Sequence, residues 1–334
     1  MNLNQNILIT GGTGSFGKKF LKMTLARYNP KKIVIFSRDE MKQWELSKEY
    51  RNEKKIRFFI GDVRDKERLN RALDGIDIVV HAAALKIVPI SEYDPFETVK
   101  TNILGAMNII DACINRGVKK VVALSTDKAV NPVNLYGSTK LAADKLFIAG
   151  NEYSAFNKTK FSIVRYGNVM GSRGSIIPHL FSQKKEKKPF TITDVNMTRF
   201  MTNLDSAVRL VWKVFDDMKG GEIYVQKNPS IKIIDIAKAI DEKKKIEIIG
   251  IRPGEKINET MISQDDSRYT YSYKNYYKIL PSINNWNEDK VRIKNGKKVE
   301  LGFQYVSDIN SDWMTASEIK KWILKNFEND NLIF

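Results

Sequence analysis

The stretch Ile7-Leu-Ile-Thr-Gly-Gly-Thr-Gly-Ser-Phe-Gly17 decides the fold of this chain of 334 residues. An apolar run of strand length leads into Gly11, Gly14 and Gly17, spaced three residues apart. The first glycine permits a tight turn, the second lets backbone N–H groups approach a pyrophosphate at a helix N-terminus, and the third lets helix and strand pack closely. The stretch therefore predicts a strand, a turn and a helix that bind a dinucleotide, with Thr13, Ser15 and Phe16 in the same site.

Strand and helix patterns alternate outward from this turn. Apolar runs of strand length cover residues 6–10, 32–37, 56–61, 76–82, 118–125 and 161–166. Helical spacing of apolar residues covers 18–28, 66–73, 99–116 and 138–149. Such alternation is typical of repeated βαβ units, in which the strands are buried on both faces. We therefore expect an α/β fold with a doubly wound parallel sheet of the Rossmann type.

The second half of the chain has a looser pattern. Loops rich in Gly, Pro and Thr follow residue 166, and then come a helix at 204–218, a strand at 222–225, a helix at 233–240 and a strand at 246–249. Beyond residue 263 only a final helix at 316–326 can be predicted. We expect a dinucleotide-binding Rossmann domain over 1–165 and a smaller, mainly substrate-binding lobe over 166–334, with segments that return to the first domain.

Composition limits the classes of protein to consider. The chain has 42% hydrophobic and 28% charged residues, as soluble globular proteins do, and a formal net charge of +17. Its lysines are spread out apart from short clusters such as 184–188 and 243–245, which favours solvated surfaces over nucleic-acid binding. The single Cys113 excludes an intramolecular disulfide, and no apolar run is long enough to cross a membrane. We expect a cytoplasmic protein with neither nucleic acid nor membrane as partner.

The end of the second predicted strand indicates which dinucleotide binds. NAD enzymes usually place an acidic residue there for the ribose 2′-hydroxyl, but this chain has Ser37. Arg38 and Lys42 offer cations that suit a 2′-phosphate, so NADP is favoured. The alternatives are a solvated surface pair, or a hydroxyl bound by Asp39. The remaining predicted cofactor contacts are Asp62 and Val63 at the adenine and Ala82, Ala83 and Ala84 along the cofactor backbone.

The sequence disfavours two other kinds of site, a nucleoside-triphosphate loop and a metal site. Gly12, Gly17 and Lys18 fit the spacing of a nucleoside-triphosphate loop, but Lys19 follows where that loop needs Ser or Thr for Mg²⁺. The two histidines, His81 and His179, have no second histidine or acidic cluster at ligand spacing, so no metal is expected.

Tyr136 and Lys140 form the predicted reactive pair. They lie one helical turn apart, shortly after a strand that ends at Leu124-Ser-Thr-Asp-Lys128. A lysine near a phenol would lower its pKa from about 10, so that the phenolate could accept a hydroxyl proton while hydride leaves for a nicotinamide. The same spacing also occurs by chance in many helices.

The glycine turn, the Tyr136 and Lys140 pair, and Asn168 after Arg165-Tyr-Gly together resemble the extended short-chain dehydrogenase/reductase family. Further motifs are similar to one branch, the inverting UDP-N-acetylglucosamine 4,6-dehydratases of pseudaminic acid biosynthesis. These motifs are His81-Ala-Ala-Ala-Leu-Lys86, Leu124-Ser-Thr-Asp-Lys128, Tyr166-Gly-Asn-Val-Met-Gly-Ser-Arg173, Met197-Thr-Arg-Phe200 and Arg252-Pro-Gly-Glu-Lys256. The similarity covers nearly the whole chain.

The resemblance implies a reaction on a UDP-linked amino sugar. Oxidation at C4 gives a ketone, which acidifies the C5 proton. Lys128, if neutral, would remove that proton, and Asp127, if protonated, would assist loss of the C6 hydroxyl as water. Thr126 would hydrogen-bond the C4 oxygen beside Tyr136. Return of the hydride to C6 and reprotonation of C5 from the opposite face would give an inverted 4-keto-6-deoxy sugar, and Asp followed by Lys, rather than by Glu, is the feature of the inverting branch.

The same resemblance implies the sugar-nucleotide contacts and a homo-oligomer. The contacts it implies are Lys86, Asn168, Arg173, Arg199, Arg252 and Glu255. Ile87 and Met201 depart from residues common in the branch and would border the sugar, so they leave the hexose and its stereochemistry open.

Three alternatives remain at this stage. The first is a 4,6-dehydratase with further 5-epimerase activity toward an N-acetylfucosamine precursor, and the second is a UDP-sugar 4-epimerase. The third is a non-catalytic NADP-sensing protein, although such proteins typically lose the Tyr and Lys pair, which this chain keeps.

Overall fold

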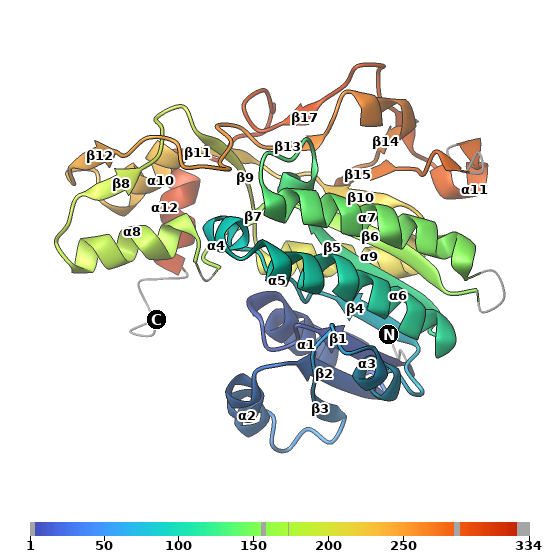
Figure 1. Cartoon of the computed structure of the whole chain (residues 1–334). Coiled ribbons are helices and arrows are strands. Elements are labelled where there is room, and N and C mark those ends of the chain that lie inside the picture. Colours follow the sequence, from blue (N-terminus) through green and yellow to red (C-terminus); the bar gives the residue numbers. More distant parts are fainter. Residues whose placement is uncertain (1–3, 155–157, 173, 284–287, 326–334) are drawn as a thin grey trace.

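A computed structural model describes residues 4–154, 158–172, 174–283 and 288–325. A central sheet with helices on both faces dominates the structure (Figure 1). It has ten strands in the order β16-β14-β15-β10-β6-β5-β4-β1-β2-β3. The strands that pair in parallel are β1 (Asn6–Thr10), β2 (Lys32–Ser37), β3 (Ile56–Ile60), β4 (Ile78–His81), β5 (Lys120–Thr126), β6 (Lys160–Tyr166) and β10 (Ile223–Gln226). The predicted α/β fold with a doubly wound parallel sheet is confirmed.

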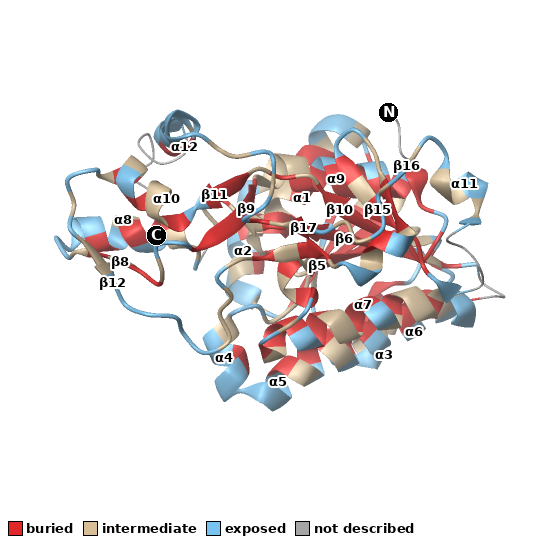
Figure 2. Ribbon diagram, turned by 90° about the horizontal axis from the view of Figure 1, so that it is seen from above, coloured by how far each residue is buried: buried red, intermediate tan, exposed pale blue. Residues whose placement is uncertain are grey.

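The sheet is buried on both faces. Ile7 and Ile9 of β1 pack in one apolar core, whereas Leu8 between them packs in the other. Successive residues of a strand point to opposite faces, which explains the continuous apolar run in the sequence. One face carries α1 (Ser15–Tyr28), α2 (Glu40–Glu49) and α9 (Leu204–Asp217), and the other carries α3 (Lys66–Ala72), α6 (Gly105–Asn115) and α7 (Leu135–Tyr153). Figure 2 shows the buried strands between these helices.

The predicted strands and helices of the first half agree with the structure to within a few residues. Three features differ, and the first is α4 (Val88–Tyr93), a helix that was not predicted. The helix expected at 99–116 forms in three pieces, which are α5 (Pro95–Val99), a π-helical turn (Lys100–Leu104) and α6. The helix α2 was not predicted; Asp39 caps it by accepting a hydrogen bond from the backbone N–H of Lys42 at 2.9 Å.

Three antiparallel strands extend the sheet where the sequence gave no clear period. They are β15 (Tyr276–Ile279), which pairs with β10, and then β14 (Thr270–Ser272) and β16 (Lys297–Lys298). Lys278 interrupts the apolar pattern of β15. It is nevertheless only 1% exposed, because its ammonium forms an ion pair with Asp217 at 2.6 Å. A buried charge is tolerated when it is paired in this way.

A smaller lobe has its own apolar core beside the main sheet (Figure 1). Its strands are β7 (Asn168–Val169), β9 (Thr198–Thr202) and β11 (Ser230–Lys232) in one sheet and β8 (Phe190–Ile192) with β12 (Ile246–Ile248) in another. Its helices are α8 (Ile176–Lys185), α10 (Ile233–Ile240) and α12 (Ala316–Ile323); the last residue of the predicted helix 316–326 lies outside the described residues. The division into domains at residue 166 stays a prediction. The strands β10, β14, β15 and β16 come after this residue in the sequence but lie in the main sheet.

In the part of the chain that the structure describes, every helix is too short or too polar to cross a lipid bilayer.

Candidate active site

The glycine turn between β1 and α1 has the form that a diphosphate requires. Gly11 has φ +64°, and a Cβ there would lie 2.9 Å from the backbone nitrogen of Ala83. A Cβ on Gly17 would lie 2.5 Å from Cα of Gly12, so only glycine allows this packing. Among the described residues, no side chain caps α1, and its first turn contains no acidic residue. The N–H groups and the positive end of the helix dipole thus suit the phosphates of a dinucleotide.

Lys19 does not serve this turn. Its ammonium forms an ion pair with Asp205 on α9 at 2.7 Å, so the residue joins α1 to α9. The position that a nucleoside-triphosphate loop reserves for a Mg²⁺-binding hydroxyl is occupied by a side chain engaged elsewhere.

The residues predicted to select NADP lie together after β2. Arg38 is 51% exposed, and its guanidinium lies 3.6 Å from the carboxylate of Asp62. Lys42 forms an ion pair with Asp39. Ser37, at the end of β2, accepts a hydrogen bond at Oγ from Gln43 at 3.0 Å. Asp39 is engaged both as the cap of α2 and by Lys42, which disfavours it as the ligand of a ribose hydroxyl.

A hydrogen-bond network fixes the end of β4 against β1. Oγ1 of Thr10 accepts from the N–H groups of Ala82 and Ala83 at 3.1 and 3.2 Å and lies 2.9 Å from Nδ1 of His81. Burial, together with the charge of Lys140, lowers the pKa of His81 to about 3, so this imidazole is neutral. The described residues contain no group of three His, Cys, Asp or Glu side chains placed to hold a metal ion.

Tyr136 and Lys140 lie on the first turns of α7. Asn134 caps this helix by accepting from the N–H of Gly137 at 2.7 Å, and Nζ of Lys140 donates to the carbonyl of Leu124 at 2.7 Å. The expectation that Lys140 lowers the phenol pKa is wrong for this arrangement. Burial raises the pKa of Tyr136 to about 12, and the partly opposing effects come from Lys128 and a hydrogen bond with Thr126.

Thr126, Asp127 and Lys128 form a compact cluster at the carboxyl end of β5. Oδ1 of Asp127 accepts from Oγ1 of Thr126 at 2.8 Å and from Nζ of Lys128 at 3.1 Å. Oδ2 of Asp127 is buried and has no hydrogen-bond partner among the described residues. Since Tyr136 interacts with both Thr126 and Lys128, four of the five predicted catalytic side chains meet at one place, and Lys140 is the fifth.

The neutral Lys128 that the sequence hypothesis requires is not the form that this arrangement favours. Burial disfavours the charged amine, but the carboxylates of Asp127 and Glu259 outweigh this effect and hold the pKa of Lys128 above its usual range. Glu259 lies 3.0 Å from Nζ of Lys128. The side chain is therefore an ammonium in the structure, and a proton must leave it before it can act as a base.

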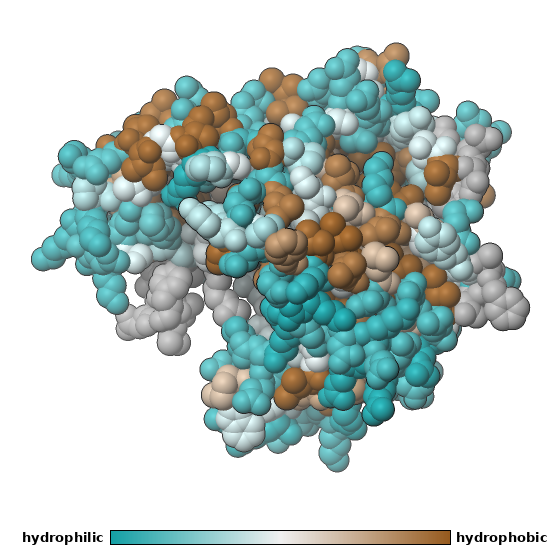
Figure 3. Space-filling view, in the orientation of Figure 1, coloured by the Kyte–Doolittle hydropathy of each residue, from teal (hydrophilic) through white to brown (hydrophobic). Residues whose placement is uncertain are grey.

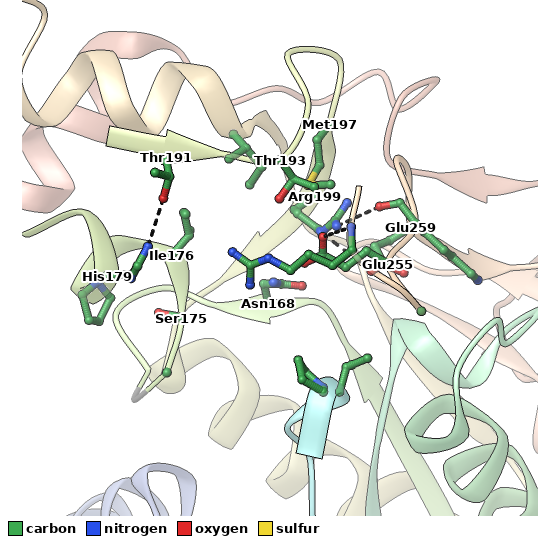
Figure 4. Close-up of a pocket in the computed structure, with 18 of the residues that line it drawn as sticks. Asn168, Ser175, Ile176, His179, Thr191, Thr193, Met197, Arg199, Glu255 and Glu259 are labelled. Atoms are coloured by element: carbon green, nitrogen blue, oxygen red, sulfur yellow. Dashed lines mark hydrogen bonds and ion pairs between the residues drawn. The ribbon is translucent and has the colours of Figure 1, made fainter. Parts of the chain in front are cut away.

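A cavity of about 940 Å³ opens between this cluster and the lobe. Several predicted sugar-nucleotide contacts line it, namely Asn168, Arg199, Arg252 and Glu255, together with Lys128. Figure 4 shows His179 and Thr191 at one end of the cavity and Arg199 and Glu259 toward the other. Lys86 is exposed and does not line the cavity, and Arg173 lies outside the described residues.

Arg199 is more confined than expected for a phosphate ligand. It is 7% exposed, and its guanidinium donates to the backbone carbonyls of Lys256 and Ile257 at 2.8 Å each. Its Nε lies 3.7 Å from Glu259. The residue therefore holds the segment that carries Glu259 in place, and direct contact with a diphosphate stays a prediction.

Three positioning contacts were missed by the sequence analysis. Asn102 exchanges hydrogen bonds with both backbone groups of Leu85 at 2.9 Å and donates to Thr139 on α7 at 3.0 Å. Nδ2 of Asn134 donates to the carbonyl of Gly254, and Nζ of Lys256 donates to that of Val130, both at 2.7 Å. These contacts join distant segments, so local spacing carries no signal for them. Glu259 had one weak signal, since it follows the Arg252 to Lys256 motif closely.

The parallel sheet, the glycine turn and the phenol and lysine on α7 define an enzyme fold of the extended short-chain dehydrogenase/reductase type. The chain belongs to the polysaccharide biosynthesis protein family, whose pattern it matches over residues 7–281. A Campylobacter jejuni protein (serotype O:23/36, strain 81-176) named UDP-N-acetylglucosamine 4,6-dehydratase (inverting) is 53% identical over 94% of this chain and 96% of its own. A Rickettsia akari protein named UDP-glucose 4-epimerase is 42% identical over 97% of this chain and 96% of its own.

Solved structures show the same fold. A Bacillus thuringiensis protein called Pen superposes with a TM-score of 0.89 at 38% identity, covering 96% of this chain and 98% of that one. The dTDP-glucose 4,6-dehydratase DesIV from Streptomyces venezuelae, solved with NAD and TYD bound, superposes with a TM-score of 0.68 at 20% identity over 75% of this chain and 86% of that one. At that identity the second likeness shows the fold alone.

Proposed function

We propose that this chain is an NADP-dependent, C5-inverting UDP-N-acetylglucosamine 4,6-dehydratase. The single observation that carries the proposal is the cluster of Thr126, Asp127 and Lys128 beside Tyr136, at the edge of a cavity large enough for a sugar nucleotide. The near full-length identity of 53% to the Campylobacter jejuni enzyme supports the same activity.

The cofactor site is the glycine turn together with the loops after β2, β3 and β4. Its geometry suits a nicotinamide dinucleotide. DesIV, which has the same fold, was solved with NAD bound, and this supports the same class of cofactor. NADP is the finer proposal, supported by Arg38 and Lys42 and by the engagement of Asp39 as a helix cap. When bound, the dinucleotide would accept the hydride from C4 of the sugar and later return it to C6.

Tyr136 and Thr126 act on the C4 hydroxyl in this proposal. The phenol must first lose its own proton to solvent, and the resulting phenolate accepts the hydroxyl proton as C4 is oxidised, while Thr126 hydrogen-bonds the same oxygen. Because burial raises the pKa of Tyr136 to about 12, only a small fraction of this side chain is phenolate near neutral pH. The positive charge of Lys128 beside the phenol partly opposes the effect of burial and favours the phenolate. Lys140, one turn along α7, donates to the carbonyl of Leu124 and so joins this helix to β5.

Asp127 and Lys128 carry out the elimination. Transfer of a proton from Nζ of Lys128 to the carboxylate of Asp127 would give the neutral amine and the protonated acid that the reaction needs. The amine then takes the C5 proton, and the acid donates to the departing C6 hydroxyl. Oδ2 of Asp127, buried and without a partner among the described residues, is the oxygen left to accept a hydrogen bond from the substrate.

The rest of the cavity would hold the UDP-linked amino sugar. Asn168, Arg252 and Glu255 line it and are the proposed contacts, and Arg252 is exposed at its wall, where a diphosphate would meet a cation. Lys86, Arg173 and Arg199 remain proposed contacts from the resemblance alone. The product would enter a pathway of polysaccharide or pseudaminic acid synthesis.

A 4-epimerase is the second candidate, because the Rickettsia akari relative is named for that activity. Epimerisation needs only the C4 oxidation and return of hydride to C4. The ion pair of Lys128 with Asp127 would then have no chemical role, which favours the dehydratase. A dehydratase with additional 5-epimerase activity would use the same residues.

The decisive test is NMR of the product made from UDP-N-acetylglucosamine and NADP in deuterated water. The dehydratase gives a 4-keto-6-deoxy sugar with the L configuration and deuterium at C5, whereas an epimerase returns an intact C6 hydroxyl. Lys128→Ala and Tyr136→Phe should each lose about 10²- to 10⁴-fold in turnover. Tyr153→Phe, an exposed tyrosine on the same helix, is the matched control and should keep full activity. Equal activity of all variants would refute the proposal.

The proposal includes a homo-oligomer in the cytoplasm. Large apolar side chains are exposed on neighbouring helices, among them Ile90 on α4 (Val88–Tyr93), Phe96 on α5, Leu104 on the π-helical turn and Met107 on α6. Figure 3 shows hydrophobic residues gathered over this face. Such a patch is typical of a surface that pairs with another copy. The buried thiol of Cys113, the single cysteine, suits a reducing compartment.

A further inference from the structure

Glu259 is a buried carboxylate that the proposed reaction leaves without a role. It lies just before β13 (Thr260–Ile262), and its side chain is 2% exposed. Its backbone N–H donates to Oγ of Ser307 at 2.9 Å, and its carbonyl accepts from the N–H of Ser307 at 2.9 Å. The carboxylate is thus held at a fixed place in the wall of the cavity, which it lines together with Lys128.

The carboxylate and Asp127 together hold the ammonium of Lys128. Oε1 of Glu259 lies 3.0 Å from Nζ, and Oδ1 of Asp127 lies 3.1 Å from it. An ammonium has three donors, so two are taken by carboxylates, one from the neighbouring residue and one from a distant part of the chain. Oε2 of Glu259 is buried without a hydrogen-bond partner in the described part of the chain. Such an incompletely satisfied carboxylate is costly in a fold and is typical of functional sites.

We propose that Glu259 is a positioning residue that, with Asp127, clamps the Lys128 ammonium and so controls when this side chain can accept a proton. The inference rests on the function proposed above. For Lys128 to act as a base, one N–H bond must break, the electron pair must stay on Nζ, and the proton must pass to Oδ1 of Asp127. The carboxylate of Glu259 stabilises the ammonium and thereby sets the pH range in which this transfer occurs.

Other titratable groups face the same cluster from the neighbouring elements. They are Asp127 in the 3-10 turn (Asp127–Ala129), Tyr136 on α7, Arg199 on β9 and Lys256 in the loop before Glu259. The two cations favour the neutral amine, and the two carboxylates favour the ammonium. Glu259 is the carboxylate outside the proposed acid–base pair, so its charge can be removed without removing a reacting group.

Competitive acetylation of the Lys128 amine, followed by mass spectrometry of the full-length protein after digestion, measures this clamp without any turnover. Glu259→Gln keeps the shape and one acceptor oxygen but removes the charge. Its Lys128 should be acetylated about tenfold faster than that of the parent protein at about pH 8, because a fall of one pKa unit gives tenfold more amine. The matched control is Asp308→Asn, which removes an exposed carboxylate that accepts from Asn258 at 2.9 Å beside Glu259. It should leave the rate unchanged.

Turnover of UDP-N-acetylglucosamine supplies the second measurement. In Glu259→Gln the rising limb of kcat against pH should move down by about one unit while the plateau stays within a few fold. In Glu259→Ala the limb should move equally and the plateau should fall, because the amine is no longer held in position. If Glu259→Gln does not fold, Glu259→Asp, whose shorter side chain cannot keep the 3.0 Å contact, takes its place.

An acetylation profile of Lys128 that is identical in the parent and variant proteins overturns the clamp, even if the enzyme is an active dehydratase. Faster acetylation in Glu259→Gln, in a protein that does not turn over the sugar nucleotide, keeps the clamp and refutes the proposed function instead.

Discussion

Replacing Arg38 with alanine should weaken the binding of NADP far more than that of NAD. The guanidinium lies after β2, next to Ser37, where the 2′-position of the adenosine ribose is expected. A phosphate at that position offers several charged acceptor oxygens to the planar guanidinium of Arg38, whereas a hydroxyl does not. The variant should therefore distinguish the two cofactors.

The size of the effect follows from the exposure and partners of Arg38. A hydrogen bond to a charged group contributes about 1.5–3 kcal/mol, and the lower part of this range applies because the side chain is 51% exposed. Binding the phosphate also weakens the 3.6 Å contact with Asp62, and an exposed pair of this kind contributes about 0–1 kcal/mol. A net loss of about 1–2 kcal/mol corresponds to a fall in NADP affinity of about 5- to 30-fold.

Isothermal titration calorimetry of the purified protein with each cofactor measures this effect without turnover. Lys42→Ala should act in the same direction. Lys48→Ala, on the same helix and placed over the ring of Trp44, should leave both affinities unchanged. High salt should reduce the preference for NADP, since both cations are partly exposed. Tighter binding of NAD than of NADP by the parent protein, or an equal loss for both cofactors in Arg38→Ala, would refute the reasoning.

Three further predictions concern stability. Gly17→Ala places a Cβ 2.5 Å from the backbone of Gly12 and should lower the free energy of unfolding, measured in urea, by about 1–3 kcal/mol. It should also weaken cofactor binding. An unchanged unfolding midpoint would contradict the close packing. Asn102→Ala leaves the backbone of Leu85 without its partners and should cost about 1–3 kcal/mol, measured in the same way, with Asn70→Ala on the exposed face of α3 as the control. Burial opposes ionisation of Asp217, but hydrogen bonds from Lys278, Lys294 and Tyr224 lower its pKa to about 2. The resulting stabilisation of about 2 kcal/mol should be present above about pH 4 and be lost as the pH falls toward 2. The difference in unfolding free energy between the parent protein and Asp217→Asn should therefore shrink over that range. A difference that stays constant would argue against the ion pair.

The first half of the fold could be predicted because its residues carry local signals. The glycine turn leaves no room for a Cβ, and the strands β1, β2, β4, β5 and β6 are largely buried on both faces and so appear in the sequence as apolar runs. The strands β14, β15 and β16 could not be predicted, since they are short and one of them buries Lys278. Its partner Asp217 lies on α9, and only tertiary structure brings the two together.

The candidate site divides in the same way. Tyr136, Lys140 and the run from Thr126 to Lys128 are found by motif, and the structure brings Thr126, Asp127, Lys128 and Tyr136 together. Charge states were not predictable, because the ammonium of Lys128 depends on Glu259, a residue far along the chain. The same holds for Arg199, whose donors are directed to carbonyls that no sequence pattern identifies.

The two contacts between the loop at 252–256 and the start of α7 have a practical consequence. Because Asn134 holds Gly254 and Lys256 holds Val130, the loop that we propose contacts the sugar nucleotide and the helix that carries Tyr136 form one mechanical unit. An engineer who grafts this loop from a relative to change which sugar is accepted should transplant residues 130–134 along with it. A loop exchanged alone would lose these two hydrogen bonds, and the new sugar would be misplaced relative to Tyr136.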